Sequence, residues 1–90
     1  MSENKRKKAV ALKYEEKTHS APVIKAKGQG YIAEKILQEA KSRDIPVYED
    51  PSLAELLGEL DVNETIPEDL FQAVAEVFAF IYRLEKIERN

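Results

Sequence analysis

The chain contains no cysteine and no tryptophan, and its 90 residues include a single histidine. Without cysteine there is no disulfide framework and no thiolate metal site. The histidine, His19, stands between Thr18 and Ser20, which is typical of a solvated polar loop, and one histidine alone does not form a metal site. No nucleophile motif stands out elsewhere. We therefore expect no catalytic residue, no metal and no cofactor.

Long apolar runs are missing as well. No stretch reaches the ~18 apolar residues that a membrane span needs, and the AVAL run at residues 9–12 is too short for a signal peptide. A chain of 90 residues with 43% hydrophobic content is suited to one small globular domain. We expect this domain to be cytoplasmic.

Charge is unevenly distributed along the chain, which carries a net charge of −3. Residues 1–27 contain eight Lys or Arg and three Glu, whereas residues 28–90 contain six basic and fourteen acidic residues. A basic head on an acidic body indicates a solvated tail, a head that binds an acidic partner, or a head that lies on its own body. Nucleic-acid binding through Lys5-Arg6-Lys7-Lys8 is an alternative, but no aromatic residues are interleaved and the acidic body would repel phosphate.

The stretch Pro22–Asp50 predicts a strand, a helix and a second strand. Residues 23–27 alternate apolar and lysine side chains, and glycines then end the strand. Residues 31–42 place apolar side chains on one helical face. Pro46 prevents the helix from continuing, and Val47-Tyr48 opens the next strand. A βαβ unit of this length should be parallel and right-handed.

Further elements flank this unit. Residues 9–14 alternate as a first strand, which we expect to pair in antiparallel fashion with residues 23–27. Asp50 and Pro51 are typical of the cap and first position of a helix. A last helix opens at Pro67, and we expect its long apolar stripe to lie across the sheet. That stripe comprises Leu70, Val74, Val77, Phe78, Ile81 and Leu84.

These elements predict an α/β fold: a small mixed sheet of three to four strands containing the βαβ unit, packed by about three main helices. We place the folded domain at residues 9–84, a flexible basic tail at residues 1–8 and a frayed tail at residues 85–90. We expect the tyrosines to be half-buried core residues, with a shared binding face as the alternative. They are Tyr14, Tyr31, Tyr48 and Tyr82.

A glycine motif offers an alternative function. Gly28-Gln29-Gly30 begins a G-x-G-x-x-A pattern between a strand and a helix, and acidic residues follow about twenty positions later. This pattern is typical of a nucleotide-binding protein. Against it, 90 residues hold few βαβ units, and Lys25 and Lys27 interrupt the strand. The structural explanation is that the glycines form the turn and let the helix pack closely.

Four segments occur in an order and with a spacing that resembles the cytoplasmic C-terminal domain of the FlhB/YscU/SpaS family of the flagellar and type III secretion export apparatus. The segments are AVALKY at 9–14, APVIKAKG at 21–28, IPVYEDPSLA at 45–54 and IPEDLFQAVAEVFAFIYRL at 66–84. The resemblance therefore covers residues 9–84, nearly the whole predicted domain.

The family motif Asn-Pro-Thr-His precedes the first strand, and in the family its asparagine cyclises and cuts the chain before the proline. Asn4 matches that asparagine, but Lys5, Arg6 and Lys7 replace the other three residues. We therefore expect a non-cleaving homologue. We also expect a free-standing domain that lacks the family's membrane region and the strand before the cleavage site. An open sheet edge beside Ala9–Tyr14 would then accept a strand from another chain or form a homo-oligomer. The alternative is that the basic run Lys5–Lys8 guards this edge.

The resemblance implies a non-enzymatic protein-interaction module related to the export switch. Its partners would be protein components or substrates of the flagellar/type III export apparatus, and it would be recruited from the cytoplasm to the membrane export gate. We expect binding to use basic residues of the head and the first two strands, with ordinary solvation of these side chains as the alternative. The candidates are Lys5, Arg6, Lys7, Lys8, Lys13, Lys25 and Lys27.

Overall fold

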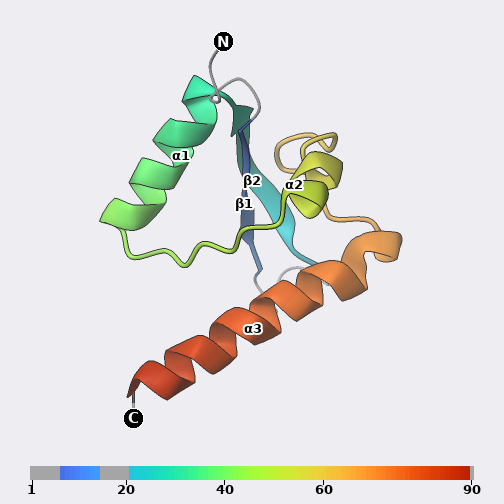
Figure 1. The fold of residues 1–90 in the computed structure, drawn as a ribbon. Coiled ribbons are helices and arrows are strands. Elements are labelled where there is room, and N and C mark those ends of the chain that lie inside the picture. The colour runs from blue at the N-terminus through green and yellow to red at the C-terminus, as the bar shows by residue number, and fades with distance from the viewer. Residues whose placement is uncertain (1–6, 15–20, 90) are drawn as a thin grey trace.

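The structure is a computed structural model that describes residues 7–14 and 21–89, with side chains described as far as residue 86. Its elements are β1 (Lys8–Lys13), β2 (Val23–Gln29), α1 (Tyr31–Ser42), α2 (Pro51–Leu57), a 3-10 turn η2 (Glu68–Leu70) and α3 (Phe71–Arg89) (Figure 1). The three predicted helices are all present. The chain forms an α/β fold, as the sequence predicts.

β1 and β2 pair in antiparallel fashion, which confirms the predicted hairpin. The register changes after Ala11: Ala11 lies opposite Ala26, whereas Leu12 lies opposite Ile24. Lys25 is therefore an extra residue on β2, and it makes a bulge that interrupts the alternation of side chains along this strand.

The predicted third strand is not formed. Within the described residues the sheet has two strands, so the expected sheet of three to four strands and the parallel βαβ unit are wrong. Residues 43–50, here called the connecting segment, pass from α1 to α2 without a strand neighbour. Pairing defines a strand, and the β-favouring residues Val47 and Tyr48 have no partner on which to form one.

Residues 63–66 cover the outer edge of β2 near its start. The backbone N–H of Ile24 donates to Glu64 O at 3.0 Å, and the N–H of Asn63 donates to Ile24 O at 2.6 Å. A single β-bridge joins Val23 to Thr65. These bonds hold the loop before η2 against the sheet and bring Ile66 into the core.

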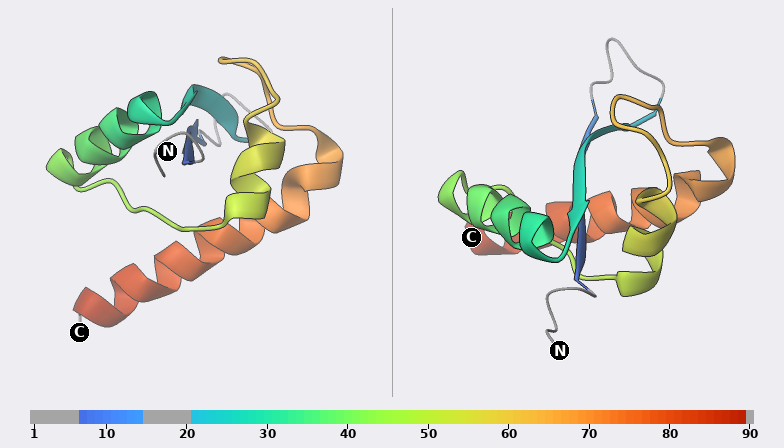
Figure 2. Two further views of the ribbon diagram at one scale, coloured as in Figure 1. Left: turned by 45° about the horizontal axis from the view of Figure 1, so that its top comes forward. Right: turned by 90° about the horizontal axis from the view of Figure 1, so that it is seen from above.

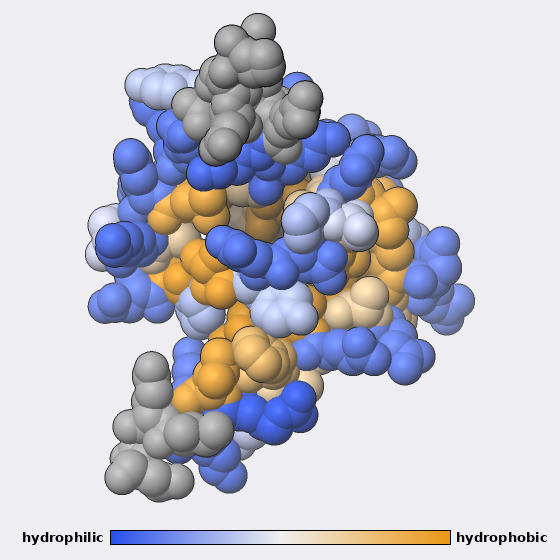
Figure 3. All heavy atoms as spheres, in the orientation of Figure 1, coloured by the Kyte–Doolittle hydropathy of each residue, from blue (hydrophilic) through white to orange (hydrophobic). Residues whose placement is uncertain are grey.

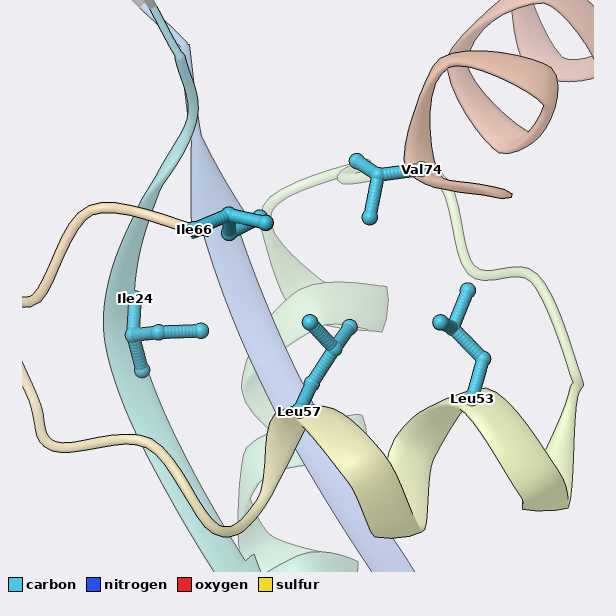
Figure 4. Close-up of a cluster of buried hydrophobic side chains, with 5 residues drawn as sticks. All are labelled: Ile24, Leu53, Leu57, Ile66 and Val74. Carbon is cyan, nitrogen blue, oxygen red and sulfur yellow. The ribbon is translucent and has the colours of Figure 1, made fainter. Parts of the chain in front are cut away.

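The hairpin lies between two helices. α1 contacts β1 and β2 from one side, and α2 contacts β1 from the other (Figures 1 and 2). The core gathers five buried side chains from β2, α2, the loop before η2 and α3, which point toward one another in Figure 4. They are Ile24, Leu53, Leu57, Ile66 and Val74.

Local chemistry explains both ends of the connecting segment. At its beginning, the N–H groups of Ile45 and Asp44 donate to Ala40 O and Lys41 O at 2.8 and 3.2 Å. This is a Schellman motif, with Asp44 in the left-handed position at φ 58°. At its end, an Asp50 side-chain oxygen accepts from the Leu53 N–H at 3.1 Å, which confirms the predicted cap of α2.

α3 does not lie across the sheet as expected. Its first turns bury Val74 and half-bury Val77, but Phe80 is 41% exposed and Leu84 is 47% exposed. A helix of 19 residues is ~28 Å long, whereas two strands span only ~10 Å in width. The sheet is therefore too narrow to cover the apolar stripe, and α3 continues beyond the body to Arg89 (Figure 1).

Candidate functional site

The predicted basic residues that the structure describes do not gather on one surface. Lys5 and Arg6 lie outside the described residues, as does Asn4 of the altered cleavage motif. Lys7 and Lys8 are exposed at the start of the hairpin.

Lys8 and Lys27 face α2. The Lys27 ammonium donates to Gly58 O at 3.0 Å, at the C-terminal end of the helix, where a positive charge is favourable. Lys8 Nζ lies 3.8 Å from the carboxylate of Glu55. Both lysines line an open hollow between the hairpin and α2, together with Glu55 and Glu59. The contact of Lys27 fits a structural role, because it ties β2 to the end of α2.

Lys13 and Lys25 are exposed elsewhere on the hairpin. Lys13 ends β1, and Lys25 occupies the bulge, so neither lines the hollow that Lys8 and Lys27 share. The regular alternation assumed from the sequence fails at the bulge. Of the expected basic face, β1 keeps one lysine at each end, Lys8 and Lys13.

The glycine turn has a packing role. A Cβ placed on Gly28 would lie 2.3 Å from Ile32 Cγ2 and 2.8 Å from Ile32 Cβ, which is closer than non-bonded carbons approach. Gly30 has φ 61°, a conformation that favours glycine. The two glycines thus let α1 begin directly against the hairpin, as the structural explanation of the motif predicts.

The tyrosines are not core residues. Tyr14, Tyr31, Tyr48 and Tyr82 are all exposed, which makes the core interpretation wrong. Two of them contact α3: the Tyr48 ring meets Phe80 edge-on with ring centroids 5.2 Å apart, and the Tyr14 ring lies 6.5 Å from Phe78. These contacts link the connecting segment and the end of β1 to α3.

The connecting segment exposes apolar side chains beside these rings. Ile45 and Val47 are each 52% exposed. Figure 3 shows apolar atoms (orange) reaching the surface in several places on one face, including along α3. The sequence signal for this surface was the β-favouring pair Val47-Tyr48, which we interpreted as the start of a strand.

Within residues 7–14 and 21–89, no group of three or more His, Cys, Asp or Glu side chains is arranged to hold a metal ion. No helix among these residues is long and apolar enough to cross a membrane.

The site is thus a two-stranded hairpin with a lysine at each end of β1, set between α1 and α2 and beside the exposed aromatic side chains of α3. The fold is that of a small α/β domain. Solved structures share this fold. The cytoplasmic domain of FlhB from Shewanella putrefaciens matches with a TM-score of 0.89 and 36% identity over 92% of this chain and 65% of that chain. The C-terminal domain of PscU matches with a TM-score of 0.78 and 29% identity over 83% of this chain and 96% of that chain.

The model of the FlhB HrpN YscU SpaS Family matches residues 3–81, and the chain belongs to this family. It is similar to Uncharacterized protein YlqH of Bacillus subtilis (strain 168), with 45% identity over 93% of this chain and 90% of that protein. It is also similar to the flagellar biosynthetic protein FlhB of Helicobacter pylori, with 47% identity over 87% of this chain. The match spans only 22% of that FlhB. The resemblance expected from the four segments is confirmed.

Proposed function

We propose that this chain is a non-enzymatic protein-interaction module of a flagellar or type III export apparatus, which binds its components or substrates. The observation that carries the proposal is the close match to the FlhB cytoplasmic domain, with a TM-score of 0.89. The region that matches belongs to an export protein in each FlhB relative. We place its action in the cytoplasm, with recruitment to the membrane export gate, because the matching FlhB structure is a cytoplasmic domain.

The proposed binding surface combines the lysines with the edge of β1. Lys7, Lys8 and Lys13 are exposed, and Lys5 and Arg6 extend the same basic run in the sequence. Lys25 adds charge at the bulge, whereas Lys27 contributes less because its ammonium is bound to Gly58 O. Acidic partners would be drawn to both ends of β1, with a strength that falls as salt is raised.

The replaced cleavage motif supports a chain that binds without cutting itself. Three lysine or arginine residues, Lys5, Arg6 and Lys7, stand where the family has Pro, Thr and His. Nucleotide binding through Gly28-Gln29-Gly30 is not favoured, because the contact with Ile32 already accounts for Gly28. Nucleic-acid binding by the basic run would give a steep dependence of affinity on salt and no preference for export proteins.

Affinity capture from a flagellated Bacillus subtilis lysate tests the proposal, since that organism has both a YlqH relative and an FlhB protein. We expect the tagged chain to enrich identified export-apparatus components or substrates. A chain with Lys5, Arg6 and Lys7 changed to Gln reports on the basic run while keeping the backbone of β1, and a chain with Lys41 and Arg43 changed to Gln is the matched control at a distant basic site. Capture of no export protein by the intact chain would refute the proposal.

A further inference from the structure

The outer edge of β1 presents backbone groups to the outside of the hairpin. The Gly30 N–H donates to Lys7 O at 2.7 Å, so this pair is hydrogen-bonded across the hairpin. Bonded and non-bonded positions alternate in an antiparallel ladder, which points the N–H and C=O groups of Lys8 and Val10 outward. The N–H and C=O groups of Leu12 also point outward. Its partner Ile24 bonds to residues 63 and 64 rather than to β1, so Leu12 and Ile24 form a non-bonded pair.

These outward groups have no strand neighbour within the described part of the chain, where β1 pairs with β2 alone. A strand edge in this state is a template for another extended chain. The edge of β2 differs, because residues 63–66 already bond to its start.

The connecting segment offers a second set of unused backbone groups. In Figure 2 (left), β1 lies between β2 and this segment. Among the residues described, positions 46–49 make no backbone–backbone hydrogen bond. Ile45, Val47 and Tyr48 remain about half exposed although they favour strands. Val47 and Tyr48 produced the incorrect prediction of a third strand, so the segment has a strand's composition but no strand partner among the described residues.

Helices flank the place where an added strand would lie. α1 and α2 both contact β1, from opposite sides of the hairpin. Val10 and Leu12 are partly buried against the core cluster and would be buried further by a neighbour. An incoming strand would therefore find apolar surface for its middle residues as well as hydrogen-bond partners for its backbone.

We propose that the outer edge of β1, together with residues 45–49, binds an extended segment of another protein with β-branched apolar residues in its middle and acidic residues at its ends. The ends of β1 carry Lys8 and Lys13, which favour acidic residues directly opposite. A second copy of β1 paired in antiparallel register would set Lys8 against Lys13 of the copy, and such like-charge pairs are unfavourable. This inference rests on the proposed function and names the chemistry of the partner.

The test is NMR of the full chain with a synthetic peptide of the same length as β1, acetyl-Glu-Val-Thr-Val-Thr-Glu-amide, at millimolar concentration. In the free chain we expect fast amide exchange at Val10 and Leu12 and slow exchange at Ala9 and Ala11, whose N–H groups point to β2. The peptide should protect Val10 and Leu12 and shift Val47 and Tyr48. Protection of Val10 and Leu12 before the peptide is added would overturn the proposal, since it would mean that the chain covers its own edge or dimerises through it.

Two control peptides separate strand addition from charge attraction. Replacing both Thr residues by Pro removes backbone donors while keeping the charge, and we expect no protection. Replacing both Glu by Lys should weaken binding by about two- to fivefold at each end. Equal binding of all three peptides, or shifts confined to the outer faces of α1 and α3, would overturn the inference.

The variant Lys13→Glu reverses the charge at one end of β1. It should reduce the ratio of the affinities for the Glu-ended and the Lys-ended peptide by about two- to fivefold, which is the effect of one charge pair. The matched control is Lys41→Glu on α1, which should leave the preference unchanged. If no peptide binds while export proteins are still captured, this inference fails and the proposed function stands. If export proteins are not captured either, both fail.

Discussion

Substitution of Gly28 by alanine gives the sharpest test of how the hairpin and α1 fit together. The added Cβ would lie 2.3 Å from Ile32 Cγ2 and 2.8 Å from Ile32 Cβ. Rotation of the side chain moves the Cγ2 atom, but the Cβ atom is fixed to the backbone of α1. The helix start must therefore move away from β2.

Overpacking of this kind costs about 1–3 kcal/mol. Alanine recovers about 0.4–1 kcal/mol through the lower entropy of the unfolded chain. We expect the free energy of unfolding to fall by about 1–2 kcal/mol, and Tm to fall by roughly 5–15 °C for a domain of this size. Urea denaturation followed by far-UV circular dichroism measures the first quantity, and a thermal scan measures the second.

Gly58→Ala is the matched control. Gly58 has φ −67°, which any residue adopts, and its added Cβ would lie 3.1 Å from the Ala54 carbonyl oxygen. We expect a change within about 0.5 kcal/mol. In a double-mutant cycle, Ile32→Ala should recover part of the loss caused by Gly28→Ala, because the Cγ2 atom is gone. An unchanged Tm for Gly28→Ala would refute the close-approach explanation and reopen the glycine turn as a ligand site.

Three further predictions follow from the local chemistry. Asp44→Gly should raise the free energy of unfolding by about 0.5–1 kcal/mol, since Asp44 holds φ 58° at the end of α1; Asp44→Ala should lower it, and a stabilising alanine would contradict the assignment. Asp50→Ala should lower the free energy of unfolding by about 1 kcal/mol, because it removes the acceptor of the Leu53 N–H. Asp50→Asn keeps a side-chain acceptor and should lose much less; equal losses for the two variants in urea denaturation would disprove the cap. The purified chain should keep its intact mass on prolonged incubation, because only Asn4 of the cleavage motif is present; a fragment beginning at Lys5 in mass spectrometry would show that the altered motif still cuts.

The helices were predictable because their signals are local. Asp50 and Pro51 mark the start of α2 in the sequence, and the structure forms the cap that they predict. The glycines before Tyr31 likewise mark the start of α1. Each of these features depends on residues a few positions apart, so no distant neighbour was needed to interpret them.

The predictions that were wrong depend on neighbouring residues that are distant in sequence or that the described part of the chain does not contain. Val47 and Tyr48 favour a strand, but strand formation depends on a neighbour that the described chain does not provide. The bulge at Lys25 divides the expected basic face, and no local signal announces it. α3 has the apolar stripe of a buried helix, yet a two-stranded sheet is too narrow to cover Phe80 and Leu84.

The most direct measurement of the central claim is photo-crosslinking in flagellated Bacillus subtilis cells, with a benzophenone amino acid placed at single positions of the chain. Val47 reports on the connecting segment, and Gln38, exposed on α1, is the control. We predict adducts from Val47 that mass spectrometry identifies as export-apparatus components or substrates, and far fewer from Gln38. Absence of export proteins from the adducts at both positions and at Lys13 would contradict the role in export proposed for this domain.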